Sequence, residues 1–214
     1  MRTRLVIAAS IGIAAMLLLA GCTDERGGTE GPIGGSPTSE SQESGHGLPN
    51  SGAPKVEKPI DTGQFEADPC SVASTGQLRK AGFTVKSAES EPEGTTGSEC
   101  IWKFERGPGG ARYGSLAGAF IGLHDQGLSA LYARRSSYKL FEELPSVAGY
   151  PAVIYNTTDA RKQGLCTVSI GIRDDQNYEI ATSLDTGHPD YADSCKVAVE
   201  IAEIAVEMMK KGQP

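Results

Sequence analysis

The residue with the clearest chemistry is Cys22, which ends the short segment Leu19-Ala20-Gly21-Cys22. A leucine and two small residues in front of a cysteine resemble a lipobox. In a lipobox, a diacylglyceryl group is added to the cysteine and the chain is cut just before it. Several acyl chains such as palmitate on one residue form a firm anchor, since each buried CH₂ contributes about 0.8 kcal/mol. The motif therefore predicts lipidation at Cys22.

The segment in front of Cys22 has the organisation of an export signal. Arg2 and Arg4 form a basic start, and the run from Leu5 to Ala20 is apolar apart from Ser10 and Gly12. A basic start, an apolar run and a small-residue cleavage site define a secretory signal peptide. The run is short for a membrane-spanning helix, which needs about 20 apolar residues. We expect residues 1–21 to be removed and the lipid-anchored protein to lie on the extracytoplasmic face of the cell membrane.

Four further cysteines follow Cys22, namely Cys70, Cys100, Cys166 and Cys195. An even number of cysteines in an exported domain favours disulfides. Four cysteines allow three pairings, which the sequence leaves open. We favour Cys70–Cys100 and Cys166–Cys195, because each pair would join an expected helix to a nearby expected strand. No two of the four have the C-x-x-C spacing of zinc sites and thiol-exchange enzymes, so we expect neither a metal nor a cofactor.

Two patterns resemble catalytic motifs but lack the context that catalysis needs. Asp-Thr-Gly occurs at 61–63 and 185–187, and paired aspartates activate water in aspartic proteases. The first triplet lies in a low-complexity segment and His188-Pro189 follows the second, so two polar turns explain both. Ser136–Lys139 reads S-x-x-K without the S-D-N and K-T-G elements of penicillin-recognising enzymes. We therefore predict no catalytic residue in either pattern.

The histidines and one basic cluster are weaker candidates. His46, His124 and His188 are scattered, and no G-x-S-x-G accompanies them, so we interpret His124 and His188 as surface or hydrogen-bonded residues. A second group, Arg134, Arg135 and Lys139, is basic within an acidic domain. A solvated helix end is the simpler interpretation of this group, and contact with an anionic ligand is the alternative.

Composition divides the chain after the leader into two parts. Residues 22–64 are rich in Gly, Pro, Ser, Thr and Glu and hold none of the aromatic residues, the first of which is Phe65. Such a segment cannot bury enough apolar surface to offset its ordering entropy, which predicts a disordered tether. Residues 65–214 suit one folded domain. The net charge of −7 includes Arg2 and Arg4, so the mature chain is more acidic still and nucleic-acid binding is disfavoured.

Periodicity within residues 65–214 predicts helices at both ends and strands between them. Asp68 and Pro69 suit the start of a helix that runs to Lys80, and Asp190–Lys211 has the helical spacing of a long terminal helix ending near Gly212. A short helix is expected over 128–135. The expected fold is α+β, a mainly antiparallel sheet packed by helices on one face. Its strands are predicted at 83–90, 100–105, 116–123, 138–144, 151–155, 165–173 and 178–184.

Five short motifs in order resemble a known family. They are Asp68-Pro69-Cys70, Cys100-x-Trp102, Gly149-x-Pro151-Ala152, Cys166-x-Val168 and Asp193-x-Cys195-x-x-Ala198. Together, behind the lipobox, they resemble the actinobacterial lipoprotein family called domain of unknown function 3558, over about Phe65 to Met209. The resemblance implies an envelope lipoprotein with a conserved pair of disulfides and no established activity. It assigns no catalytic residue.

A tethered, disulfide-linked domain is suited to holding a recognition surface away from a membrane. We therefore expect a non-enzymatic binding or interaction module of the cell envelope, whose partner is an envelope protein, a lipid or a cell-wall component. The alternatives are an envelope hydrolase and a structural or accessory lipoprotein. A large apolar cavity would favour a lipid or another small ligand. An exposed apolar patch over a filled core would favour a protein partner.

Overall fold

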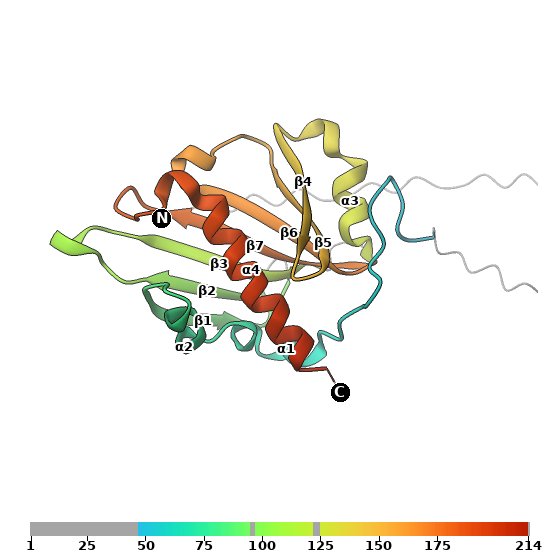
Figure 1. Ribbon diagram of the computed structural model, residues 1–214. Helices are drawn as coiled ribbons and strands as arrows, with labels where there is room; N and C mark the ends of the chain where they lie inside the picture. The colour runs from blue at the N-terminus through green and yellow to red at the C-terminus, as the bar shows by residue number, and fades with distance from the viewer. Residues whose placement is uncertain (1–46, 95–96, 122–124, 214) are drawn as a thin grey trace, which may run out of the picture. The chain divides into compact units, whose positions relative to one another are not determined.

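A computed structural model describes residues 47–94, 97–121 and 125–213. Seven strands form one sheet in the order β1-β2-β3-β7-β6-β5-β4, and every neighbouring pair is antiparallel (Figure 1). Short connections join β4 to β5 and β6 to β7, as antiparallel neighbours allow. The expected α+β class, the antiparallel sheet and the long C-terminal helix are confirmed.

The elements have the following bounds. The strands are β1 Val85–Glu91, β2 Glu99–Phe104, β3 Gly114–Ile121, β4 Leu140–Val147, β5 Tyr150–Asn156, β6 Leu165–Arg173 and β7 Gln176–Leu184. The α-helices within the described ranges are α1 Gly63–Ala67, α2 Thr75–Lys80, α3 Gly127–Ala133 and α4 Ser194–Lys211.

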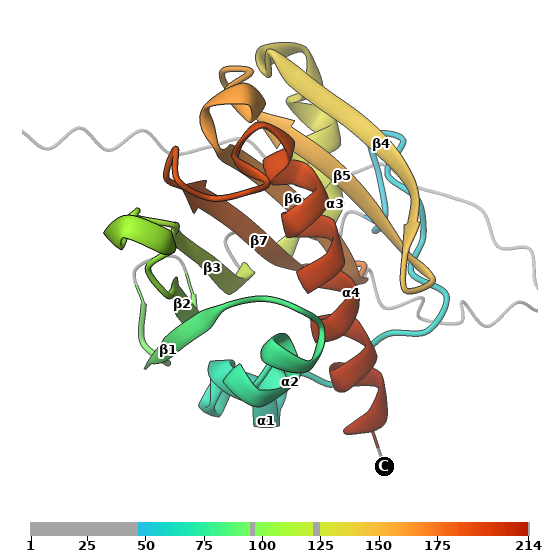
Figure 2. The same cartoon turned by 60° about the vertical axis from the view of Figure 1, so that its left-hand side comes forward.

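One face of the sheet, which we call the α4 face, carries the main core. Helix α4 crosses this face in front of β6 and β7 (Figure 2). Its apolar stripe recurs at helical spacing, and Ala198, Ile201 and Ala205 have no exposed surface. From the sheet, the alternation in β2 directs Trp102 into the same core, where its indole Nε1 donates a hydrogen bond to the Ala73 carbonyl at 2.9 Å. The core on this face is filled by large side chains.

The opposite face, which we call the α3 face, has a smaller apolar cluster. Leu128, Leu131 and Tyr132 of α3 are buried against Val153 of β5. Figure 2 shows α3 behind the sheet and α4 in front of it. Helix α3 contacts β6 and β7, so a short helix lies on this face in addition to the helices that pack on the α4 face.

The ordered chain begins earlier than the predicted boundary at residue 65. Val56 and Ile60 belong to the main core with 3% and 1% of their surfaces exposed. The backbone N–H of Ile60 bonds to the carbonyl of Ile172, and that of Val56 bonds to a carboxylate oxygen of Asp174. Because two isolated apolar residues do not change the average composition of a polar segment, composition alone placed this boundary too late.

The predicted helix from Pro69 to Lys80 is interrupted in the structure. A 3₁₀ turn over Pro69–Val72 ends at the extended residue Ala73, and α2 then begins after Ser74. Ser74 and Gln77 form a reciprocal capping box, which satisfies backbone donors at the start of α2. Asp68 makes no side-chain capping bond, so its predicted capping role is wrong.

Several predictions fall outside the described residues. These are the signal peptide at 1–21, lipidation at Cys22, the tether up to residue 46, and the positions of His46 and His124. Within the described ranges, no helix combines the length and the apolar character that crossing a membrane would require.

Candidate functional site

The four cysteines of the domain form the two favoured disulfides. Cys70 is bonded to Cys100 and Cys166 to Cys195, with Cα–Cα distances of 4.9 and 5.1 Å. Each bond joins a helical segment to a strand across 30 or 29 residues of sequence. In the chain-entropy model, closing a loop of about 30 residues contributes about 3–4 kcal/mol. The cysteines therefore have a structural role in this domain.

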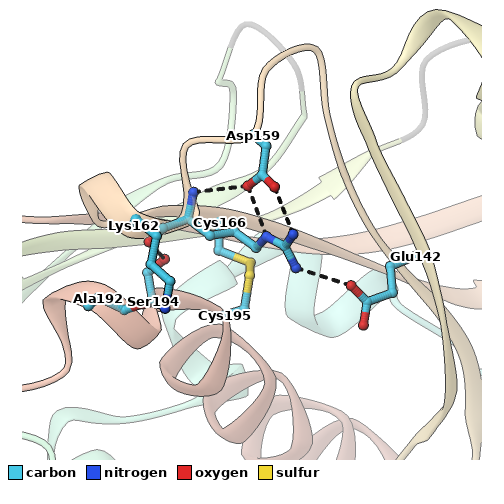
Figure 3. Close-up of polar contacts among 8 residues, drawn as sticks. Glu142, Asp159, Lys162, Cys166, Ala192, Ser194 and Cys195 are labelled. Carbon is cyan, nitrogen blue, oxygen red and sulfur yellow. Dashed lines mark hydrogen bonds and ion pairs between the residues drawn. A yellow bond between two sulfur atoms is a disulfide. The ribbon is translucent and has the colours of Figure 1, made fainter.

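Polar contacts surround the second disulfide at the start of α4 (Figure 3). The Arg161 guanidinium forms ion pairs with Asp159 at 2.7 Å and with Glu142 at 3.2 Å. The Ser194 hydroxyl donates to the Arg161 carbonyl at 3.0 Å. The charges of these side chains are paired with one another and not directed at a ligand. We therefore interpret the network as a set of contacts that holds the first turn of α4 in place.

The α3 face contains a cleft between α3 and the strands β3 and β7, which we call the α3 cleft. Its volume is about 390 Å³ and its lining is mostly apolar. Three alanines of the sheet, Ala117, Ala119 and Ala181, form its floor, and Leu131 of α3 forms part of its wall. Side chains this small leave space that larger residues occupy on the α4 face. The volume lies in the range of small-molecule sites, about 300–1,000 Å³.

A partly buried polar pair lines this cleft. The Tyr155 hydroxyl of β5 donates a hydrogen bond to the Glu179 carboxylate of β7 at 2.8 Å. Burial raises the pKa of Glu179, and the hydrogen bond from Tyr155 partly opposes that rise. The hydroxyl of Ser169, the cross-strand neighbour of Glu179, is buried without a hydrogen-bond partner among the described residues. Burial, together with the charge of Glu179, raises the pKa of Tyr155.

A second polar residue of β7 also lines the cleft. Asn177 is 3% exposed, and its side-chain oxygen Oδ1 has no hydrogen-bond partner among the described residues. Asn177 and Glu179 are two residues apart, so both side chains are on the α3 face of β7. A buried acceptor without a partner has a free-energy cost of about 1–3 kcal/mol. The oxygen itself has almost no accessible surface, so this unpaired acceptor is enclosed by the protein and is not presented to the cleft.

The family model described as "Protein of unknown function (DUF3558)" matches residues 17–208. The chain belongs to this family. No curated protein and no solved structure matches it.

In this DUF3558 member, the structure does not bring together the sequence patterns that resemble catalytic motifs. His188 is buried between the rings of Phe104 and Tyr113, with ring centroids 5.0 and 5.3 Å away. Its Nδ1 accepts the backbone N–H of Asp190 at 3.0 Å, and burial lowers its pKa. His188 is thus a packed, hydrogen-bonded residue, which agrees with its interpretation from the sequence as a surface or hydrogen-bonded histidine.

The two Asp-Thr-Gly triplets have separate surroundings. Asp61 accepts the backbone N–H of Gly63 at 3.1 Å, and its own N–H donates to Gln213 at 2.8 Å. Asp185 lies 3.5 Å from the guanidinium of Arg112 in an exposed ion pair. In the S-x-x-K segment, the Ser137 hydroxyl donates to the carbonyl of Arg134 at the end of a helix. These contacts agree with polar turns and helix ends.

One member of the predicted basic cluster does line the α3 cleft. Arg134 lies in its wall, whereas Arg135 and Lys139 are exposed elsewhere. The Nε of Arg134 donates to the carbonyl of Ala130 at 3.3 Å. Within the described ranges, no group of three or more His, Cys, Asp or Glu residues could hold a metal ion.

The sequence interpretation missed Tyr155, Asn177 and Glu179. One signal was present in the strand Gln176–Leu184, where Asn177 and Glu179 alternate with the apolar Tyr178 and Ile180. That alternation indicates which face each residue is on, but the cleft depends on the position of α3 and on the alanines of β3.

Proposed function

We propose that this chain is an extracytoplasmic lipoprotein, anchored through Cys22, whose domain binds a small ligand in the α3 cleft without chemical turnover. The single observation that carries the proposal is the cleft of about 390 Å³, with an apolar floor and a partly buried polar pair, Tyr155 and Glu179. A mostly apolar cavity with a few convergent polar groups is the usual form of a small-molecule site.

The surface of the domain supports a small ligand over a protein partner. In the described part of the chain, Leu165 is the one large apolar side chain that is exposed, at 40%. A contiguous exposed apolar patch larger than several hundred Å² would mark a protein interaction site. The accessory-lipoprotein alternative predicts neither cavity nor patch, so the cleft argues against it.

The hydrolase alternative requires a base beside a nucleophile. His188 lies between two aromatic rings, and its Nδ1 is engaged with backbone. The proposal therefore assigns no catalytic step to this residue, and the polar groups of the α3 cleft are given a binding role.

Native mass spectrometry of the lipidated chain, purified from its own membranes, tests the cleft. We expect the wild-type protein to retain a bound mass and Ala119→Leu to lose it, because the added carbons fill the floor of the cleft. Ala133→Leu is the matched control, since Ala133 is exposed on α3 and does not line the cleft. Equal retention by both variants would contradict the proposed site.

A second experiment tests the anchor. Cys22→Ser removes the thiol that the lipobox predicts to be acylated. We expect loss of metabolic labelling with a palmitate analogue and release of the protein from the membrane fraction. Cell fractionation with immunodetection measures the release. Unchanged membrane retention would contradict lipid anchoring at Cys22.

A further inference from the structure

The first part of the described chain lies against α3 before it enters the main core. We call residues 47–60 the strap, which runs beside α3 and then towards α1 (Figure 1). The backbone N–H of Asn50 donates to the Ser129 hydroxyl of α3 at 2.9 Å, and Ser129 is only 1% exposed. Ala53 packs against the small cluster that α3 forms with Val153. The strap therefore contacts α3 through both a hydrogen bond and apolar packing.

The strap and α3 are attached to the same point of the sheet, the turn between β6 and β7. The backbone N–H of Val56 donates to the Asp174 carboxylate at 2.8 Å. Gly127, the first residue of α3, lies so close to the Asp174 carbonyl that an added Cβ would be 2.4 Å from its oxygen. Beyond Val56, the strap is held independently of α3, because Ile60 is buried in the main core and its N–H bonds to a carbonyl of β6. Residues 47–56 can therefore leave the sheet while the rest of the strap stays in place.

The shape of the α3 cleft depends on where α3 lies. Gly127, Ala130 and Leu131 of α3 line the cleft, whose floor is formed by the alanines of the sheet. Leu131 also belongs to the cluster that receives Ala53, and the cleft-lining ring of Tyr155 packs against the same cluster. Because α3 has only seven residues, its intrinsic helical stability is small and its position depends on packing. Loss of the strap contacts would therefore loosen one wall of the cleft.

We propose that the strap is a clamp on α3, and that undocking of residues 47–56 opens the α3 cleft. The inference concerns the regulation of this site, and it rests on the proposed function only for the ligand that the opened cleft would release. In the proposed lipoprotein, the tether joins the strap at its α3 end, so tension between the anchor and the domain acts on the α3 contacts first. Local opening of this kind leaves the main core folded.

Hydrogen exchange of the full lipidated chain in nanodiscs, followed by mass spectrometry, tests the clamp. Ser129→Ala removes the acceptor of the Asn50 N–H, and alanine is the stronger helix former, so faster exchange in α3 would not come from lower helix propensity. Asp174→Ala removes the acceptor of the Val56 N–H at a turn outside α3. We expect each variant to exchange about fivefold faster over both 50–56 and 127–133, as the loss of one hydrogen bond allows.

Two further variants serve as controls. Gln213 binds the backbone of Asp61, just beyond the strap, through its side-chain oxygen and nitrogen. Gln213→Ala therefore removes contacts of the adjacent segment and should leave exchange over 127–133 unchanged. Asp174→Asn keeps an oxygen that can accept the Val56 N–H, and we expect it to restore the wild-type rates.

A thiol on the floor of the cleft measures the opening itself. Ala119 is 8% exposed, so a cysteine introduced by Ala119→Cys should react slowly with iodoacetamide in the docked state. We expect alkylation of this position to become about fivefold faster when Ser129→Ala or Asp174→Ala is added, and to stay unchanged with Gln213→Ala. Peptide mapping distinguishes position 119 from the disulfide-bonded cysteines.

Several results would overturn the clamp. Unchanged exchange over 127–133 in Ser129→Ala and Asp174→Ala would show that the strap does not hold α3. Faster exchange in α3 with unchanged alkylation at position 119 would show that α3 loosens without opening the cleft. An equal effect of Gln213→Ala would show a general loss of stability. These measurements need no ligand, so they are independent of the proposed function, which fails instead if the wild-type protein retains no mass that Ala119→Leu removes.

Discussion

The two faces of one sheet differ most clearly at neighbouring residues of β3. Gly118 is on the α4 face, where an added Cβ would lie 2.2 Å from the Tyr178 hydroxyl and 2.8 Å from the Trp102 ring. Ala119, the next residue, is on the α3 face and lines an open cleft. One backbone therefore supports a filled core on one side and a cavity on the other.

The difference separates the face that carries the packed core from the face that carries the proposed ligand cleft. Helix α4 is 18 residues long and covers β6 and β7 with a continuous apolar stripe. Helix α3 has seven residues and leaves a cleft over the alanines of β3. Dense packing on the first face stabilises the fold. The α3 face can then contain polar groups without hydrogen-bond partners, because packing on the α4 face offsets their free-energy cost.

The largest expected effect comes from the filled face. Trp102→Ala should lower the free energy of unfolding by about 3–5 kcal/mol, the usual range for a buried aromatic residue. The side chain has no exposed surface, and its loss also leaves the Ala73 carbonyl without its donor. Denaturant unfolding measures the change. Ile101→Ala, at the adjacent and half-buried position of the other face, is the control and should cost about 1 kcal/mol. Equal losses of stability in the two variants would contradict the difference between a filled α4 face and an open α3 face.

A smaller effect is expected at the neighbouring pair on β3. Gly118→Ala should cost about 1–3 kcal/mol, because overpacking displaces the rings of Tyr178 and Trp102. Ala119→Leu adds more atoms but should change stability by less than about 1 kcal/mol, because they enter the cleft. Thermal or denaturant unfolding of the two variants measures the contrast. A larger loss in Ala119→Leu would show that the α3 face is packed as tightly as the other.

The smallest expected effect concerns the charge of Glu179. Because its pKa is raised in the folded state, the folded protein binds more protons than the unfolded chain between the two pKa values. This contribution to stability is fully present below the unfolded value of about 4.3 and is lost as pH rises through the folded value. Glu179→Gln should therefore stabilise the domain at pH 7 more than at pH 4. A matching series of unfolding midpoints measures this. Identical gains at both pH values would contradict a desolvated carboxylate.

Glu99, Tyr155 and Arg134 face the same cleft and remain in both proteins of that comparison. The pH-dependent difference between wild type and Glu179→Gln therefore reports Glu179 itself. Glu99→Gln is the matched control. It removes the other carboxylate of the cleft lining, and we expect it to show no comparable difference between pH 4 and pH 7.

Short-range patterns predicted much of the fold. The alternation of Cys100, Trp102 and Phe104 identified a strand with one buried side, and all three are buried in the structure. The helical spacing before Gly212 identified α4. These predictions succeeded because periodicity of 2 or 3.6 residues is a local property of the chain. The favoured disulfide pairing is also confirmed, since each bond joins elements that are close along the chain.

Predictions that depended on distant contacts were incomplete. Ile60 is ordered by a backbone bond to Ile172, more than a hundred residues away, and composition gave no sign of that contact. The interruption before Ser74 has a local cause instead. The capping box of Ser74 and Gln77 starts a new helix there, so the helix does not continue from Pro69. In the candidate site, Tyr155 and Glu179 come from β5 and β7, and only the sheet order places them within hydrogen-bond distance.

Sequence alone was sufficient for the lipobox prediction at Cys22, the cysteine content of the domain and the succession of helices and strands. Each of these depends on residues that are neighbours along the chain. The α3 cleft required the folded structure, because its floor, its polar pair and its wall come from four separate elements, β3, β5, β7 and α3. An alanine in a strand is compatible with either a packed or an open surface. The element that packs over the alanine decides which surface results. For Ala119 this element is the short helix α3, which leaves a cleft above it.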